Sequence, residues 1–195
     1  MGQWNHNIQY HDVLLRAVPS RCQHSLDAGC GTGSFARQLA LRSGEVIAID
    51  ADYDTLERGR MATPAETRVT FVRGDVMTHP FCDNSFDFIA AVATLHHLPL
   101  GPALTRFRDL LKSGGVLGAI GLYRARTAKD FALAAAALPT SWAMRRLRDY
   151  TDVEAPLQEP RETLHEIRTA CDATLHGGTV RQHLLFRYSL VWRKP

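Results

Sequence analysis

Three glycines spaced two residues apart constrain this chain more than any other feature. Gly29, Gly31 and Gly33 follow an apolar run that begins at Leu26, and apolar residues recur at helical spacing over 34–42. This order predicts a strand, a glycine turn and a helix. Glycines leave no Cβ where backbone approaches a ligand closely, and the first turn of a helix offers free N–H groups. The turn is therefore expected to hold a small molecule.

The spacing of the glycines distinguishes two kinds of nucleotide-binding turn. A nicotinamide-binding turn has the pattern Gly-x-Gly-x-x-Gly, but its third glycine would fall at Ser34. The run from Asp27 to Gly33, Asp-Ala-Gly-Cys-Gly-Thr-Gly, instead resembles the first motif of class I S-adenosylmethionine-dependent methyltransferases. The resemblance implies S-adenosylmethionine as cofactor, S-adenosylhomocysteine as product, and cofactor contacts for Asp27, Gly29, Cys30, Gly31, Thr32 and Gly33.

A second apolar strand, predicted over 46–50, ends in a carboxylate. Its last residue, Asp50, lies 17 residues after Gly33. In open α/β sheets ligands bind at the carboxyl ends of strands, where an acidic residue accepts hydrogen bonds from ribose hydroxyls. We therefore predict Asp50 as the ribose ligand, with Ala51 beside it and Asp52 as a poorer candidate for the same role. A solvated carboxylate at a strand end is the alternative.

The next predicted strand, 68–73, runs into Gly74, Asp75 and Val76. In the resembled family a carboxylate at this position accepts a hydrogen bond from the adenine amino group, and the following apolar residue lies against the ring. The resemblance implies these roles for Asp75 and Val76, with Gly74 also in the site. A simple turn aspartate is the alternative.

The strand predicted over 85–93 leads into the sequence Leu95-His96-His97-Leu98. In the resembled family this strand end lies under the methionine part of the cofactor, which implies cofactor contacts for Ala91 and Val92. The run looks most like the small-molecule branch related to quinone-biosynthesis C-methyltransferases. Enzymes that methylate nucleic-acid amino groups usually carry a Pro-Pro-aromatic turn here, and 91–94 contains no proline. We therefore expect a small-molecule acceptor and no nucleic-acid partner.

Four side chains are candidates for a general base. A base is needed only if the acceptor must lose a proton, and histidine titrates near neutrality. His97 is the first choice because it comes just after the strand end expected to face the methyl group, and His96, Tyr10 and His11 follow. The alternatives are a helix-start histidine bonded to backbone and a frayed N-terminus that carries aromatic residues by chance.

The resemblance runs in order from about residue 24 to 122. It implies an α/β fold: a single Rossmann-like, doubly wound, seven-stranded and mostly parallel sheet with an antiparallel C-terminal strand and helices on both faces. We further predict helices over 54–62, 102–112 and 160–173 and strands over 116–122, 179–186 and 188–192. One domain, 1–195, would comprise an N-terminal cap (1–20), a cofactor-binding core (24–122), an acceptor lid (123–160), and a closing helix with edge strands (161–195).

Composition and charge argue against several classes of protein. The 195 residues are 45% hydrophobic, which suits one well-buried domain, and the net charge of +3 is not concentrated in runs as in nucleic-acid binders. The four cysteines are widely spaced, so no structural metal is expected. The longest apolar segment, 131–138, is far shorter than the ~20 residues of a membrane span. We expect a cytoplasmic protein with reduced thiols, and no secretion signal is recognised.

The sequence alone leaves several alternatives open. A cluster of Arg145, Arg146 and Arg148 either attracts an acidic acceptor or forms a solvated helix face. The domain either transfers a methyl group or binds the cofactor as a regulatory or cyclisation scaffold. A nicotinamide oxidoreductase is disfavoured by Ser34. The sequence selects neither carbon, oxygen nor nitrogen as the methylated atom, nor an oligomeric state.

Overall fold

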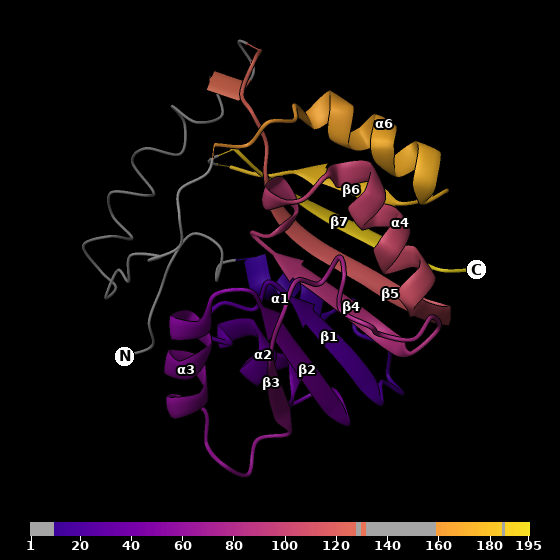
Figure 1. The fold of residues 1–195 in the computed structure, drawn as a ribbon. Coiled ribbons are helices and arrows are strands. Elements are labelled where there is room, and N and C mark those ends of the chain that lie inside the picture. The colour runs from indigo at the N-terminus through magenta and orange to yellow at the C-terminus, as the bar shows by residue number, and fades with distance from the viewer. Residues whose placement is uncertain (1–9, 128–129, 132–158, 185) are drawn as a thin grey trace.

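The computed structural model describes residues 10–127, 130–131, 159–184 and 186–195. A seven-stranded sheet in the order β3-β2-β1-β4-β5-β7-β6 runs through this part of the chain (Figure 1). In chain order the elements are α1 (His11–Leu15), β1 (His24–Ala28), α2 (Ser34–Leu39), β2 (Glu45–Asp50), α3 (Tyr53–Met61), β3 (Val69–Arg73), β4 (Phe86–Val92), the 3₁₀ helix η2 (Leu95–His97), α4 (Leu100–Leu110), β5 (Leu111–Leu122), α6 (Leu164–Thr174), β6 (Thr179–Gln182) and β7 (Arg187–Arg193).

Strands β1 to β5 are parallel, and β7 runs antiparallel to both of its neighbours. Leu26 in β1 pairs with Ile47 in β2 on one side and with Ile89 in β4 on the other. The chain thus moves outward from β1 to β3 and then returns to the opposite side of β1. Ligands of doubly wound sheets bind where the strand order reverses in this way. The predicted fold class is confirmed.

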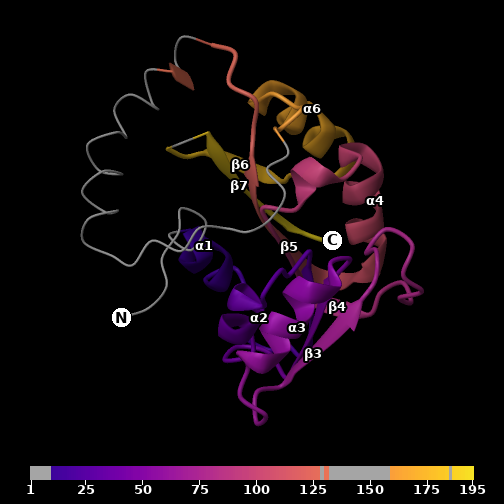
Figure 2. The ribbon, with the colours of Figure 1, turned by 60° about the vertical axis from the view of Figure 1, so that its left-hand side comes forward.

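The two faces of the sheet are covered by different helices. Successive strand residues point to opposite faces, so Phe88 packs with α1 and α2 while Ile89 packs with α4 and α6. Leu14 and Phe35 belong to the first cluster, and Phe107 to the second. Figure 2 shows α4 and α6 lying together, away from α1, α2 and α3. Apolar helix stripes on both faces account for the almost uninterrupted apolar character of the central strands.

Helix α3 forms as its sequence predicts. The carboxylate of Asp52, the N-cap, accepts a hydrogen bond from the Thr55 backbone N–H at 2.7 Å, and Leu56 is buried. A capping carboxylate satisfies one of the N–H groups that the first turn leaves unpaired. This cap fixes where the backbone turns after β2 and so positions the residues between Asp50 and the helix.

Helices α4 and α6 have other boundaries than the predicted 102–112 and 160–173, and β5 begins at Leu111 rather than at 116. Helix α4 ends at Leu110, because Leu111 pairs with Phe86 of β4 and takes extended backbone angles. Helix α6 begins at Leu164 rather than at 160, because Thr163 and Glu166 form a capping box. In that box the Glu166 carboxylate accepts from the Thr163 N–H at 2.7 Å, while the Thr163 hydroxyl accepts from the Glu166 N–H at 3.3 Å. The spacing Thr-x-x-Glu in the sequence predicts a helix that begins here.

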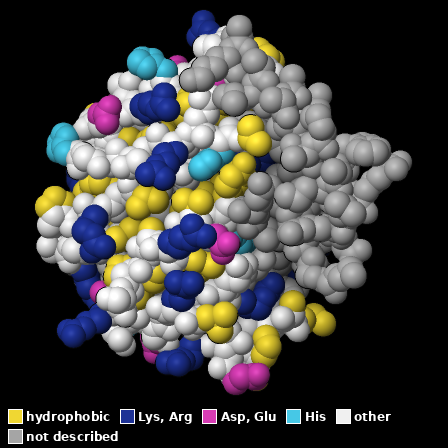
Figure 3. All heavy atoms as spheres, turned by 180° about the vertical axis from the view of Figure 1, so that it is seen from behind, with side chains coloured by type: hydrophobic (Ala, Val, Ile, Leu, Met, Phe, Trp, Pro, Cys, Tyr) yellow, Lys and Arg dark blue, Asp and Glu magenta, His cyan; other side chains and the backbone are white. Residues whose placement is uncertain are grey.

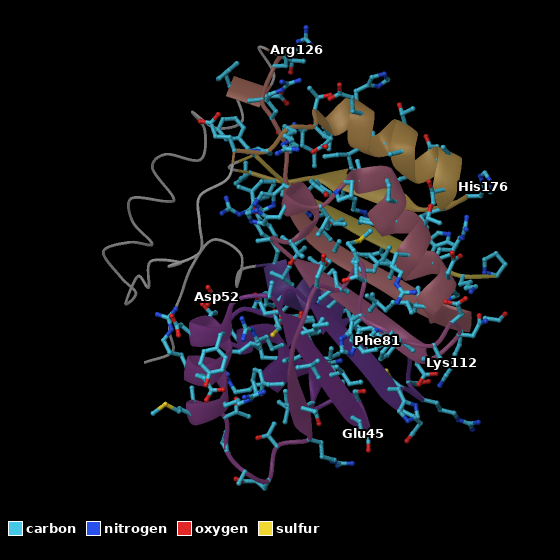
Figure 4. All side chains as sticks on the ribbon, in the orientation of Figure 1. Glu45, Asp52, Phe81, Lys112, Arg126 and His176 are labelled. Carbon is cyan, nitrogen blue, oxygen red and sulfur yellow. The ribbon has the colours of Figure 1, made fainter. Side chains whose placement is uncertain are left out.

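The C-terminal hairpin is shorter than predicted on its first side, since β6 ends at Gln182 rather than 186. Residues 1–9 of the predicted cap and most of the predicted lid, 123–160, lie outside the described residues, as do Arg145, Arg146 and Arg148. Figure 4 shows Glu45 and Asp52 at opposite ends of β2, with Arg126 beyond the end of β5. Asp52 follows the C-terminal end of β2. The loops after β1, β3 and β4 lie at this same end of the sheet.

Figure 3 shows the face turned away from the viewer in Figure 1. Basic side chains are spread across it among hydrophobic and uncharged ones, rather than lining one continuous groove. Within the described ranges no helix is both long and apolar enough to cross a bilayer. The four cysteines are free thiols, of which Cys22 and Cys171 are buried.

Candidate active site

A cavity of about 450 Å³ opens at the carboxyl ends of β1, β2, β3 and β4. Each of these strands contributes its end or the loop that follows it, and α1 and η2 close the sides. A cavity of this size matches a small-molecule site. The residues that line it are His11, Asp27, Gly29, Cys30, Gly31, Thr32, Ser34, Phe35, Ile49, Asp50, Ala51, Asp52, Gly74, Asp75, Val76, Val92, Ala93, Thr94, His97 and Leu98.

The glycine turn after β1 depends on backbone conformations that other residues rarely adopt. Gly29, Gly31 and Gly33 have φ values of +65°, +53° and +70°. A Cβ on Gly29 would also lie 2.5 Å from the side chain of Thr94. The N–H of Gly29 donates to the carbonyl of Ile49 at 2.9 Å, which joins the turn to β2. The turn is thereby held against two neighbouring strand ends with its backbone open to the cavity.

Gly33 has a different place from the other two glycines. It does not line the cavity, and a Cβ there would lie 2.6 Å from the ring of Phe71 in β3. Its lack of a side chain allows the start of α2 to pack against this strand. Among the predicted cofactor residues, Ala91 also lies outside the lining, because its side chain is fully buried among the core residues that contact α4.

Asp50 connects the glycine turn with the loop after β2. One carboxylate oxygen accepts from the Gly31 N–H at 2.8 Å, and the other accepts from the Asp52 N–H at 3.0 Å. A carboxylate has about four lone-pair sites, so both oxygens retain capacity for a further donor. The side chain lies in the cavity wall and is thus placed to accept hydrogen bonds from the hydroxyls of a ligand.

Asp27 is a buried carboxylate without a hydrogen-bond partner. Its side chain is 1% exposed, and both of its oxygens are unpaired although the residue borders the cavity. Burial raises the pKa of Asp27 to about 7. The nearby backbone N–H of Ala36, which does not reach ordinary hydrogen-bond geometry, opposes this rise, and the charge of Asp50 adds to it. Buried polar groups normally have partners. This one is therefore suited to a ligand that brings a hydrogen-bond donor or a positive charge.

The loops after β3 and β4 complete the site. The Asp75 carboxylate accepts from the Met77 N–H at 2.9 Å, which orders the turn that places Val76, 5% exposed, in the cavity wall. Thr94 donates from its hydroxyl to the carbonyl of Ala28 at 2.9 Å, so the ends of β1 and β4 are tied together. Ala93, between Val92 and Thr94, takes a positive φ of +56°. Such a conformation in a residue other than glycine often accompanies a functional site.

The four predicted bases differ in whether they line the cavity. His97 and His11 line the cavity, whereas His96 and Tyr10 do not. His11 Nδ1 accepts a hydrogen bond from the Gln38 amide at 2.9 Å, and burial lowers the pKa of His11 to about 4. His11 is therefore neutral at pH 7, with one ring nitrogen already engaged. Tyr10 stacks on His183 at a ring separation of 4.5 Å.

His96 supports its neighbour rather than facing the cavity. Its ring lies 4.0 Å from that of His97, centre to centre, and its Nδ1 is buried without a partner. Burial lowers the pKa of His96 to about 4, and the charges of His97 and Arg187 lower it further. A neutral imidazole thus packs directly behind the histidine that faces the cavity.

Six lining residues were missed by the sequence-based prediction of ligands, whereas Asp52, the poorer candidate for the ribose ligand, does line the cavity. Most are sequence neighbours of predicted ligands, so extending each predicted strand end by a residue or two would have included them. Thr94 is the most informative of these residues. A hydroxyl directly after an apolar strand indicates a candidate site residue, but the carbonyl that it binds belongs to Ala28, 66 residues away in the sequence. The six are Ser34, Phe35, Ile49, Ala93, Thr94 and Leu98.

Comparison with known proteins agrees with this geometry. The model of a methyltransferase domain family matches residues 26–119. The chain is 32% identical to an uncharacterized methyltransferase of Mycobacterium tuberculosis, over 98% of each chain. It is also 37% identical to a demethylmenaquinone methyltransferase of Staphylococcus aureus, over 57% of this chain and 48% of the relative.

A solved structure extends the comparison to the fold. Phosphoethanolamine N-methyltransferase 2 of Haemonchus contortus, in complex with S-adenosyl-L-methionine, superposes with a TM-score of 0.67 at 18% identity. The match covers 98% of this chain and 53% of that one. Together with the full-length relative, the matched domain and the glycine-turn cavity, this shows that the chain belongs to the class I S-adenosylmethionine-dependent methyltransferases.

Proposed function

We propose that this chain binds S-adenosylmethionine in the cavity at the ends of β1 to β4 and transfers its methyl group to a small-molecule acceptor. The observation that carries the proposal is the unpartnered, buried carboxylate of Asp27 beside a glycine turn that a Cβ would obstruct. When bound, the cofactor supplies an electrophilic methyl group on a sulfonium sulfur. The remaining work of the protein is to hold two reactants in line, which corresponds to effective molarities of about 10⁵ M or more.

Each strand end has its own proposed task. Asp50 accepts hydrogen bonds from the ribose hydroxyls, while Asp75 and Val76 hold the adenine. Asp27 and the backbone of the glycine turn receive the charged methionine part, whose positive charges offset the cost of ionising a buried carboxylate. All of these side chains line one cavity, so a single extended ligand contacts them together.

Two observations support a small molecule as the acceptor. A relative with 37% identity over 57% of this chain is described as a demethylmenaquinone methyltransferase. Basic side chains on the face shown in Figure 3 are dispersed, whereas nucleic-acid binders gather them along one groove or stripe. We infer that the predicted cap and lid, 1–20 and 123–160, enclose this acceptor within a single domain.

His97 is the proposed base where the acceptor must lose a proton. It lines the cavity directly after the β4 end, while His96 packs behind it and His11 has one ring nitrogen bonded to Gln38. General-base help contributes about 10²–10⁴-fold to rate, less than alignment does. The role of His97 is thus secondary to positioning.

The cofactor assignment is tested by calorimetric titration with S-adenosylhomocysteine. Asp50→Asn keeps the shape of the side chain but removes its charge, and we expect binding about tenfold or more weaker. Asp54→Asn is the matched control, because Asp54 is an exposed acid of α3 that does not line the cavity. Equal affinity in wild type and Asp50→Asn would exclude Asp50 as the ribose ligand. No binding by wild type would refute the cofactor site.

The base assignment is tested in an acceptor screen that includes demethylated quinols, with S-adenosylhomocysteine formation as the readout. His97→Ala is expected to lower kcat by about 10²-fold or more while leaving cofactor affinity within twofold. Turnover within a few-fold of wild type would show that His97 is not the base. Cofactor binding without S-adenosylhomocysteine formation for any acceptor would favour the scaffold alternative.

A further inference from the structure

His11 of α1 is a buried imidazole that lines the cavity and has no part in the function proposed above. Its helix is held on the sheet by Leu14, one turn later, which packs where a Cβ on Gly118 of β5 would lie 3.1 Å away. The His11 ring meets the ring of Phe35 in α2 edge to face, at 5.0 Å and 80°. The imidazole is thus held between two helices at the wall of the cavity.

The side-chain amide of Gln38 decides which nitrogen of this imidazole carries the proton. The amide nitrogen lies 3.2 Å from the carbonyl oxygen of Ser34 and 2.9 Å from His11 Nδ1. A carbonyl oxygen accepts hydrogen bonds and cannot donate them, so the amide turns its N–H groups and not its oxygen toward Ser34. Reversing the amide would bring two acceptor oxygens together. Nδ1 of His11 therefore accepts a hydrogen bond from an N–H of Gln38.

The proton of the ring then lies on Nε2. Burial lowers the pKa of His11 to about 4, and the neighbouring Gln38 and Asp12 only partly offset this, so the ring is neutral at pH 7. A neutral imidazole whose Nδ1 accepts a hydrogen bond carries its proton on the other nitrogen. His11 is thus a hydrogen-bond donor at Nε2 and not a base.

The charges around the cavity show which group of the cofactor such a donor suits. The charged side chains in its wall are the acids Asp27, Asp50, Asp52 and Asp75, and no lysine or arginine lines it in the part of the chain that the structure describes. The methionine part of the cofactor carries an ammonium and a carboxylate on the same carbon. Its ammonium suits the unpartnered carboxylate of Asp27, whereas its carboxylate needs neutral donors.

Asp27 and His11 reach the cavity from the same face of the sheet. Leu26 and Ala28 pack in the core on the side of α4 and α6, so Asp27 between them points to the side of α1 and α2. An ammonium bound at Asp27 places the carboxylate on its neighbouring carbon beside this pair of helices. Thr94 is not an alternative donor, because its hydroxyl already donates to the Ala28 carbonyl at 2.9 Å.

We propose that His11 binds the carboxylate of the cofactor's methionine part through its Nε2–H, and that Gln38 is a positioning residue that keeps the proton on this nitrogen. This inference rests on the proposed function, because it names the residue that recognises one group of the cofactor in the same site.

The binding role is tested by calorimetric titration of the full chain with S-adenosylhomocysteine and with its decarboxylated analogue, which keeps the amine. Wild type should bind S-adenosylhomocysteine about tenfold or more tightly than the analogue, since a hydrogen bond to a charged group is lost. His11→Phe keeps a ring against Phe35 but has no donor. It should weaken S-adenosylhomocysteine binding about tenfold or more and leave the analogue within twofold of wild type. His11→Gln should recover part of the lost affinity, because its amide nitrogen lies near the position of Nε2.

The matched control is His165→Phe, because His165 is an exposed histidine of α6 that does not line the cavity. It should bind both ligands as wild type does. Equal affinity of wild type for the two ligands, or an equal loss of both ligands in His11→Phe, would overturn the inference. If His11→Phe does not fold, the two ligands in wild type and His11→Gln decide the outcome. Failure of wild type to bind S-adenosylhomocysteine would refute the proposed function instead.

The positioning role of Gln38 is tested without any ligand. Nitrogen-15 NMR of the imidazole reports which of its nitrogens carries the proton. Wild type should show His11 neutral with the proton on Nε2, and Gln38→Met, which keeps the length of the side chain but lacks the amide, should show a mixture of both forms. A proton on Nδ1 in wild type, or an unchanged signal in Gln38→Met, would contradict this role.

Discussion

At the scale of single residues, Asp27 shows most clearly how the site departs from an ordinary core. A carboxylate that is 1% exposed, with no hydrogen-bond partner, is costly to ionise. The protein retains it at the end of β1, directly under the glycine turn. The destabilisation is greatest in the ligand-free protein, and a ligand that brings positive charge would relieve it. Stability and cofactor affinity are thus coupled through one side chain.

The pH dependence of stability should reveal this carboxylate. Burial raises its pKa from 3.8 to about 7 in the folded state. The folded protein therefore binds the proton more tightly than the unfolded chain, and stability is lost as pH rises from about 4 to about 7, by an amount of about 2–4 kcal/mol. Asp27→Asn should lack this loss, so its melting temperature relative to wild type should increase over the same range. Parallel melting profiles of the two proteins between pH 4 and 8 would contradict this account.

At the scale of elements, the strand–turn–helix unit from β1 to α2 depends on contacts that reach beyond it. Gly29 meets Thr94 from the end of β4, and Gly33 meets Phe71 from β3. Positive φ explains why each position favours glycine, but the close approach of other strands explains why a side chain would be excluded even in that conformation. The unit is therefore shaped by two neighbouring strands as well as by its own sequence.

A matched pair of glycine substitutions separates these two causes. Gly29→Ala introduces a Cβ 2.5 Å from Thr94 at a φ of +65°, whereas Gly114→Ala introduces one at a φ of +77° with no atom within 4 Å. Both should lose about 1 kcal/mol or more of unfolding free energy through backbone strain. Gly29→Ala should lose more and should weaken S-adenosylhomocysteine binding about tenfold or more. Urea denaturation and calorimetry measure the two effects, and equal losses in both variants would show that the contact with Thr94 is unimportant.

At the scale of the whole molecule, the doubly wound order brings the loops after β1, β2, β3 and β4 to one edge of the sheet. Asp50 was predicted from its place at the end of an apolar strand, whereas the roles of Asp27 and Asp75 were implied by the resemblance to the methyltransferase family. The antiparallel β7 then adds Arg187 beside the end of β5. Its place beside Leu122 follows from strand pairing, which the local sequence around Arg187 does not specify.

The amino-acid sequence by itself determined the glycine turn, the strand-end carboxylates and the alternation of strands and helices that leads to the fold. These features depend on backbone conformation and on periodicities of a few residues, which short stretches of chain contain. The tertiary structure alone decided that His97 and His11 face the cavity while His96 and Tyr10 do not, that Thr94 closes the glycine turn, and that Arg187 of β7 pairs with Leu122 at the end of β5. The physical reason is that these relations join residues distant in the chain, and their geometry exists only once strands have paired and both faces of the sheet have packed.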